Sequence, residues 1–182
     1  QMTRDFRKPL ILMTPKSLLR HKRAVSNFDM LTGDSTFHRI LWDERQENLV
    51  KPEKIKRVIL CSGKVYYDLE AARDEAGIDD IYIYRIEQLY PFPKNALAEE
   101  LKPFENADLV WCQEEPRNMG AWSFMDRRLE EVLSMLKMKS ARPVYAGRKE
   151  AASPATGYLK IHNQEQEALV NEALMISDKK TD

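Results

Sequence analysis

Two neighbouring carboxylates, Glu114 and Glu115, follow the apolar run DLVWC of residues 108–112. Such a run is typical of a buried strand, and the segment after it reads QEEPRNMGAW and ends at Trp122. Paired carboxylates can supply the acid and the base of proton-transfer chemistry. One hypothesis is therefore an independent enzyme in which Glu114 or Glu115 acts as the base.

Two physical arguments favour a structural role for these carboxylates. A helix is expected to begin near Gly120, and its dipole stabilises ionised carboxylates by about 0.3–1 kcal/mol, which is the wrong direction for a general acid. Adjacent residues of a strand also point to opposite faces, so Glu114 and Glu115 should not share one site. Interface cores are enriched in aromatic residues. We therefore predict an interface role for Glu114, Glu115, Asn118 and Trp122.

The other candidate sites for chemistry carry weaker patterns. Ser62 and Gly63 follow a second apolar run, where free backbone N–H groups could bind a phosphate, but neither the dinucleotide nor the P-loop glycine spacing is present. A tight turn is the simpler interpretation. There is no GxSxG nucleophile motif, and the three histidines are too scattered to have metal-ligand spacing.

The composition indicates one globular domain. The chain has 182 residues, of which 43% are hydrophobic and 32% charged, and it carries 29 basic and 29 acidic residues. The balanced charge gives no argument for a nucleic-acid partner, and no apolar segment approaches the roughly 20 residues that span a membrane. Cys61 and Cys112 each end an apolar run and are expected to be buried thiols in a reducing compartment.

Alternating apolar runs and helical patterns must position these residues. Strands are predicted at residues 9–13, 56–61, 81–86, 108–112 and 142–146, with a further short strand at residues 40–42. Helices are predicted at residues 16–23, 64–76, 95–101 and about 120–136, with a last helix capped by Asn163. This alternation predicts a three-layer α/β/α sandwich with a mostly parallel sheet.

A basic segment lies near the start of the chain. Lys8, Lys16 and Arg20 are among its positive residues, and only Asp5 opposes them up to residue 23. Such a run is either a solvated face or a site for an anion or a partner. The segment QMTRDFRKPL has no signal-peptide pattern, and we expect the chain to be part of a longer protein.

Five motifs occur together in one order: RKPLILMTPKSLLRHKRAV, CSGKVYYDL, RIEQLYPFP, QEEPRNMGAW, and the pair YAGR and ASPATGY. From residue 7 to about residue 174 the chain resembles the C-terminal part of 2-oxoglutarate dehydrogenase, its thiamine-diphosphate-dependent decarboxylating component. The resemblance implies a transketolase-like C-terminal domain with a five-stranded mixed sheet and one antiparallel strand. Residues 1–8 would be a linker from a preceding thiamine-binding domain, residues 9–176 the domain itself, and residues 177–182 a polar tail.

The resemblance also implies a function for the full enzyme. It would be a homodimer that decarboxylates 2-oxoglutarate on thiamine diphosphate with Mg²⁺ and passes the succinyl group to a lipoyl arm of the succinyltransferase component. This chain lacks the GDG…N segment that holds that cofactor. Gly33-Asp34-Ser35 begins with the same two residues but is not that motif. We therefore expect no cofactor and no catalysis in this chain alone.

In this family the domain supports the dimer and packs against the thiamine-binding domains, and some members bind effectors such as AMP or acetyl-CoA beside it. Lys8, Lys16 and Arg20 could pair with the phosphates of such an effector by charge-assisted bonds. Two alternatives stay open: a regulatory nucleotide-binding module, and the same domain of a 2-oxoadipate dehydrogenase. The expected compartment is the bacterial cytoplasm, or the mitochondrial matrix if the source is eukaryotic.

Overall fold

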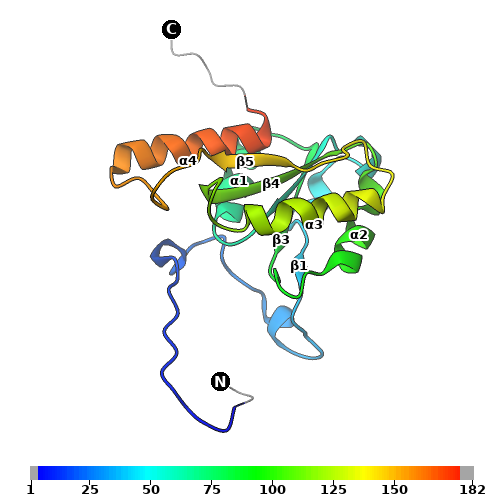
Figure 1. The fold of residues 1–182 in the computed structure, drawn as a ribbon. Coiled ribbons are helices and arrows are strands. Elements are labelled where there is room, and N and C mark those ends of the chain that lie inside the picture. Colours follow the sequence, from blue (N-terminus) through cyan, green and yellow to red (C-terminus); the bar gives the residue numbers. More distant parts are fainter. Residues whose placement is uncertain (1–3, 177–182) are drawn as a thin grey trace. The chain divides into compact units, whose positions relative to one another are not determined.

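The computed structural model describes residues 4–176, and the elements bounded here are those of that part of the chain (Figure 1). The strands are β1 (Ile40–Leu41), β2 (Arg57–Cys61), β3 (Ile81–Ile86), β4 (Asp108–Pro116) and β5 (Val144–Arg148). The α-helices are α1 (Val65–Glu75), α2 (Lys94–Leu101), α3 (Trp122–Ser134) and α4 (Leu159–Leu174). Short 3₁₀ helices occupy Lys16–Leu18, Phe28–Leu31, Gln46–Asn48, Pro52–Lys54 and Lys102–Phe104.

The chain divides into two units, Gln1–Ser35 and Thr36–Asp182. In the first unit the predicted strand at residues 9–13 is wrong: these residues form no strand, and Ile11 and Met13 are 83% and 93% exposed. An apolar run becomes a buried strand only if neighbouring strands pair with it, and the described part of this unit contains none. The predicted basic helix is reduced to the single turn Lys16–Leu18, and Arg20 adopts a left-handed φ of 62° that no helix tolerates.

The second unit contains a mixed five-stranded sheet with the order β1-β3-β2-β4-β5. Strand β1 is antiparallel to β3, and the other neighbours are parallel. The predicted fold class, an α/β sandwich with a mostly parallel sheet and one antiparallel strand, is therefore confirmed. The fifth strand is the short β1 rather than the run at residues 9–13.

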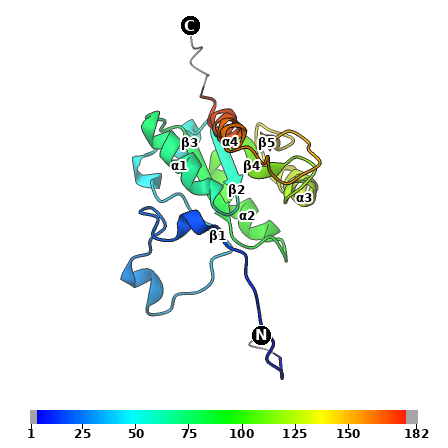
Figure 2. The same ribbon diagram turned by 90° about the vertical axis from the view of Figure 1, so that its left-hand side faces the viewer.

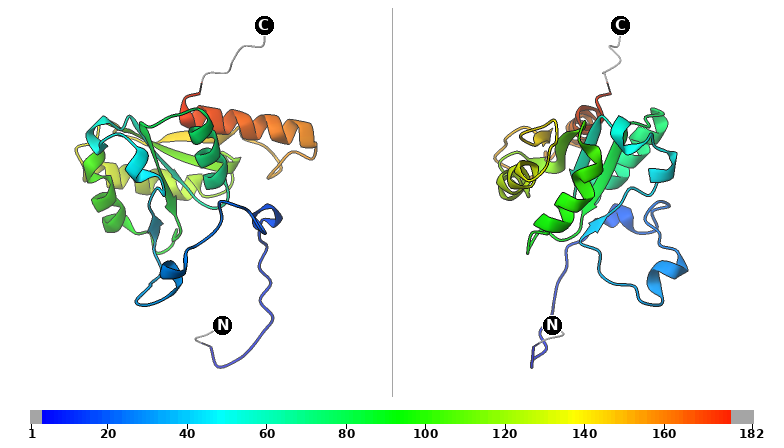
Figure 3. Two further views of the ribbon diagram at one scale, coloured as in Figure 1. Left: turned by 180° about the vertical axis from the view of Figure 1, so that it is seen from behind. Right: turned by 90° about the vertical axis from the view of Figure 1, so that its right-hand side faces the viewer.

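Helices cover both faces of the sheet. Helices α2 and α3 pack on the face that carries Leu60, Tyr84 and Trp111, whereas α1 and α4 pack on the face that carries Ile59 and Cys112. In Figure 2, β2 and β4 lie between α1 and α3. Figure 3 shows α4, in orange to red, running beside β5, with which it is in contact. Successive residues of a strand point to opposite faces of the sheet. Because these strands are mostly apolar, they contribute to an apolar core on each face.

Within the second unit, two element boundaries differ most from the sequence prediction, whereas the others differ by at most two residues. Strand β4 continues through Gln113 to Pro116, and its pairing with β5 shifts register between these two residues. Helix α4 begins at Leu159, so Asn163 lies inside the helix and the predicted cap is wrong. Residues 159–162 contain no helix breaker, and they extend the helix backwards by one turn.

A buried ion pair joins the segment after β1 to α1. The Asp43 carboxylate accepts hydrogen bonds from both terminal nitrogens of Arg73, the one from Nη2 being 2.9 Å long. Asp43 also accepts from the Ile83 backbone N–H at 2.9 Å, and Arg73 donates to the Ile81 carbonyl at 3.0 Å. Both side chains are almost fully buried. The pair therefore fastens α1 and the edge of the sheet to strand β3.

Candidate functional site

The carboxyl ends of β2 and β4 meet at the point where the sheet reverses its direction of winding. Strand β2 leads into α1 on one face, and its neighbour β4 leads into α3 on the other. The loops therefore separate between these strands, which is where open α/β sheets bind ligands. Segment QEEPRNMGAW lies in this position, so the sequence pattern and the topology indicate the same candidate site.

A polar network extends from this point toward α1 and α4. Lys64, just before α1, forms an ion pair with Glu114 at the end of β4. The Gln166 side-chain amide of α4 donates to Glu114 Oε1 at 3.0 Å and to Asp68 Oδ2 at 2.9 Å. We call Lys64, Asp68, Glu114, Arg148 and Gln166 the carboxyl-edge network. It neutralises Glu114 with a cation of the same chain.

Arg148 anchors the other end of the carboxyl-edge network. This last residue of β5 is 7% exposed, and its Nη2 lies 3.0 Å from Gln166 Oε1 and 3.1 Å from His162 Nδ1. Its Nε lies 3.5 Å from Glu165 Oε2. His162 therefore contacts an arginine and not a nucleophile, which is the partner that a catalytic base needs. The network ties β4 and β5 to α1 and α4.

Glu115 faces the opposite side of the sheet. Its side chain lines a cavity of about 580 Å³ together with Leu89, Tyr90 and Phe124. The two adjacent carboxylates therefore do not share one site, as predicted from the strand geometry. Gly63, which also lines this cavity, has a φ of 76°, which supports the tight-turn interpretation of Ser62-Gly63.

Gln113 holds the loop of the motif together, and the sequence pattern does not single it out. Its Oε1 accepts from Trp111 Nε1 at 3.0 Å and from the Trp122 backbone N–H at 2.9 Å. Its Nε2 donates to the carbonyls of Glu115, Pro116 and Met119, at 3.2, 3.2 and 2.8 Å. The residue is 4% exposed. The one signal in the sequence is a polar residue that directly follows the apolar run. A polar side chain in such a buried place needs hydrogen-bond partners.

The predicted interface residues lie at different depths. Trp122 is 8% exposed and packs against Tyr145, with ring centroids 5.1 Å apart, so most of its surface is used within the chain. Asn118 is exposed and exchanges two hydrogen bonds with the Ala151 backbone, at 3.0 and 3.2 Å. Glu114 is half-buried and Glu115 is exposed. Among these residues, Glu115 and Asn118 offer the most surface to a partner.

The predicted anion-binding residues belong to the first unit. Lys16 and Arg20 are exposed, and neither forms an ion pair within residues 4–176. Lys8 is exposed as well, and its ammonium lies 5.0 Å from the centre of the Phe6 ring. The charges of Lys16 and Arg20 are therefore available to an anion.

The thiols at this edge are unsuited to nucleophilic chemistry. Cys61 and Cys112 are in register on β2 and β4, and both are buried. Burial raises the pKa of Cys61 to about 12 and that of Cys112 well above its usual value, so both stay protonated at neutral pH. No group of His, Cys, Asp and Glu in residues 4–176 is placed to hold a metal ion. No helix in the same range is long and apolar enough to span a membrane.

Known proteins resemble the chain over nearly its whole length. Residues 25–174 match the family described as 2-oxoglutarate dehydrogenase C-terminal. Proteins named 2-oxoglutarate dehydrogenase E1 component from Brucella anthropi and Brucella ovis are each 59% identical over 180 residues, or 96% of this chain, and that of Brucella abortus is 58% identical. The chain spans only 18% of the length of these relatives. The chain therefore belongs to the family of 2-oxoglutarate dehydrogenase C-terminal domains, as its motifs predict.

Proposed function

We propose that the intact protein is the decarboxylating E1 component of 2-oxoglutarate dehydrogenase and that this chain is its C-terminal domain. The observation that carries the proposal is the identity of 59% over 96% of the chain with proteins of that name. The reaction is the oxidative decarboxylation of 2-oxoglutarate, with transfer of the succinyl group to lipoyl groups. The partners are the protein's own thiamine-binding domains, a second copy of the protein, and the succinyltransferase component. We expect no nucleic-acid or membrane partner, and the favoured compartment is the bacterial cytoplasm.

Residues 4–176 contain no group of His, Cys, Asp and Glu placed to hold the Mg²⁺ of a thiamine diphosphate site. The diphosphate of that cofactor is held through Mg²⁺, which prefers carboxylate and other oxygen ligands. Gly33-Asp34-Ser35 is an exposed stretch, and Glu114 is already paired with Lys64. We therefore assign the cofactor and its metal to the rest of the intact protein and route no catalytic step through this chain.

Exposed apolar side chains support an assembly role for the chain. In residues 4–35 they include Leu10, Ile11, Leu12, Met13, Leu19, Phe28 and Leu31, each at least 64% exposed. Covering such side chains is favourable by about 25 cal/mol for each Å² removed from water, and exposed apolar patches of this kind mark interaction surfaces. We propose that the thiamine-binding domains and the second protomer cover them.

The exposed charges of Lys16 and Arg20 support a second role, the binding of a phosphate-bearing effector such as AMP or acetyl-CoA. Two cations that form no ion pair with the described residues 4–176 can bind a phosphate without first breaking such a pair. A regulatory role of this kind is compatible with the assembly role.

One assay of the intact protein tests the proposed activity and the effector role. We expect thiamine-dependent decarboxylation of 2-oxoglutarate with a kcat/KM at least about tenfold above that of 2-oxoadipate, because substrate choice is a difference in transition-state binding. Faster turnover of 2-oxoadipate would instead favour the alternative dehydrogenase. In the same assay, Lys16→Ala combined with Arg20→Ala should remove the response to AMP and acetyl-CoA while leaving basal turnover unchanged. An unaltered response would contradict the effector role.

A further inference from the structure

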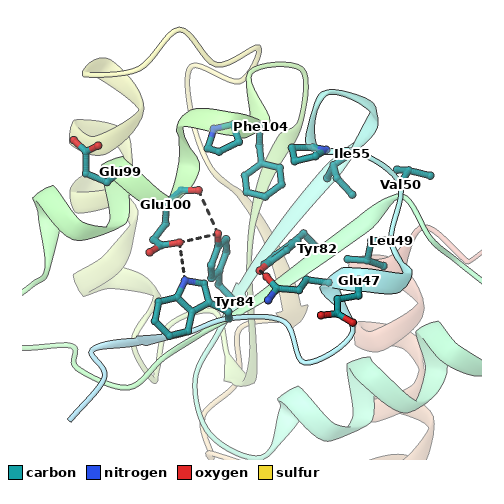
Figure 4. Close-up of a pocket in the computed structure, with 13 residues that line it drawn as sticks. Glu47, Leu49, Val50, Ile55, Tyr82, Tyr84, Glu99, Glu100 and Phe104 are labelled. Atoms are coloured by element: carbon teal, nitrogen blue, oxygen red, sulfur yellow. Dashed lines mark hydrogen bonds between the residues drawn. The ribbon is translucent and has the colours of Figure 1, made fainter. Parts of the chain in front are cut away.

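A cavity of about 480 Å³ lies beside β3, within the second unit and away from the carboxyl-edge network. Figure 4 shows its lining, with Tyr82 and Tyr84 of β3 in the centre. The volume falls in the range of about 300–1,000 Å³ that is typical of small-molecule sites. Neither the family assignment nor the proposed function gives this cavity a role.

Aromatic rings form the inner wall of the cavity. Tyr82 packs on Tyr84 and on Phe104, with ring centroids 4.6 and 5.1 Å apart, and all three residues are buried. Trp42 also lines the cavity but is 44% exposed. His38 contacts the Trp42 ring at an interplanar angle of 65°, with 5.3 Å between centroids. Trp42 is thus the ring with the most surface left for a ligand.

A carboxylate fixes the position of that indole. Glu100 Oε2 accepts from Trp42 Nε1 at 2.8 Å and from the Tyr84 hydroxyl at 3.1 Å (Figure 4). Burial, with the nearby Tyr82 and Glu100 as further causes, raises the pKa of Tyr84, so its hydroxyl stays a donor. Both donors therefore use one oxygen of Glu100. Within residues 4–176 its other oxygen, Oε1, accepts no hydrogen bond.

The cavity carries unbalanced negative charge. Among the residues that the structure describes, its lining contains Glu47, Glu99 and Glu100 and no lysine, arginine or histidine. Glu99 is paired with Lys102 at 2.6 Å, whereas Glu47 and Glu100 have no ion-pair partner in the described part of the chain. An anionic ligand is therefore disfavoured, and a cation would find two uncompensated carboxylates.

An apolar side completes the cavity. Val50 and Ile55 line it on the side of Tyr82 that is opposite Glu99 and Glu100 in Figure 4. Such a site complements a ligand with a positive head and a short apolar tail. Cations bind best over tryptophan rings, and an ammonium group offers donors that match an unused carboxylate oxygen.

We propose that this cavity binds a small organic cation, namely an alkylammonium with a short apolar tail, between the Trp42 ring and Glu100. The head contacts the indole and Glu100 Oε1, and the tail lies toward Val50 and Ile55. The same chemical group occurs as a free amine and as a lysine side chain. The cavity volume favours the free amine, since a lysine would have to bring its own backbone to the surface.

Calorimetric titration of the intact protein with n-butylammonium and with choline tests the proposal. The neutral analogues 1-butanol and 3,3-dimethyl-1-butanol serve as controls of similar shape. Each cation should bind at least about tenfold more tightly than its neutral analogue, because charge-assisted bonds and cation–π contacts are lost with the charge. A peptide with one lysine, acetyl-Gly-Lys-Gly-amide, should bind more weakly than n-butylammonium.

Three variants locate the binding. Glu100→Gln keeps an acceptor for Trp42 and Tyr84 but removes the charge, and Trp42→Leu removes the ring; each should weaken binding about tenfold. Glu75→Gln, which removes the same charge at the exposed end of α1, should leave binding unchanged.

Four results would overturn the proposal. The first is that neither cation binds, and the second is that the neutral analogues bind as tightly as the cations. The third is that both cavity variants bind the cations as tightly as wild type, and the fourth is that the lysine peptide binds whereas n-butylammonium does not. None of these results bears on the decarboxylation assay, so this proposal and the proposed function can fail separately.

Discussion

Replacing Asp43 with alanine is expected to lower the free energy of unfolding by about 3–5 kcal/mol, because it leaves the Arg73 guanidinium buried without its counter-charge. Asp43 also holds the Ile83 backbone N–H, so the replacement leaves a second buried donor unpaired. Urea denaturation of the 182-residue chain, followed by circular dichroism, measures the change.

A surface ion pair gives the matched control for this prediction. Asp126 lies 3.3 Å from Arg142, whose side chain is well exposed, and Asp126→Ala should cost less than about 1 kcal/mol. Asp43→Leu combined with Arg73→Met should recover much of the loss, since an apolar pair needs no buried counter-charge. A loss below about 1 kcal/mol for Asp43→Ala would show that the pair does not fasten α1 to β3.

Replacing Gln113 with leucine is expected to cost about 3 kcal/mol or more, because each buried group that loses its partner costs about 1–3 kcal/mol. Trp111 Nε1 and the Trp122 backbone N–H lose their acceptor, and the Met119 carbonyl loses its donor. The carbonyls of Glu115 and Pro116 also lose a hydrogen bond, but they still accept from the Tyr145 hydroxyl and from the Met119 backbone N–H. Amide exchange over residues 114–122 should also become faster, because the loop loses its central anchor.

The side-chain amide itself is tested by Gln113→Glu, which keeps the acceptors but removes the donor and places a carboxylate beside three carbonyl oxygens. This variant should also be destabilised. Gln164→Leu is the control, since Gln164 is exposed on α4 and such changes usually stay within about 0.5 kcal/mol. If Gln113→Leu and Gln164→Leu had equal effects, Gln113 would not be the hub of the loop.

Local patterns predicted most of the sheet because strands β2 to β5 are short apolar runs bounded by turns. They failed at residues 9–13, where the run is equally apolar but has no strand to pair with. Whether a neighbouring strand is present depends on distant parts of the chain and cannot be seen in the run itself. The cap assigned to Asn163 failed because cap preferences are worth only about 1 kcal/mol and are easily overridden.

The site was only partly predictable, for a related reason. The period of a strand was enough to place Glu114 and Glu115 on opposite faces. Lys64 and Glu114 are 50 residues apart in the sequence, and Asp43 and Arg73 are 30 apart, so no spacing rule connects either pair. Gln113 is an ordinary polar residue until the fold brings five backbone and indole groups to it.

We propose that this chain assembles the enzyme and does not carry its reacting groups. The most direct test compares 2-oxoglutarate decarboxylation by the intact protein with that of its Glu114→Gln and Glu115→Gln variants, with dimerisation measured by sedimentation. We expect a kcat within about threefold of wild type for both variants in the dimeric state. Loss of about 10²–10⁴-fold in kcat from a dimer that remains intact would identify one carboxylate as a general acid or base, and this chain would then carry a reacting group.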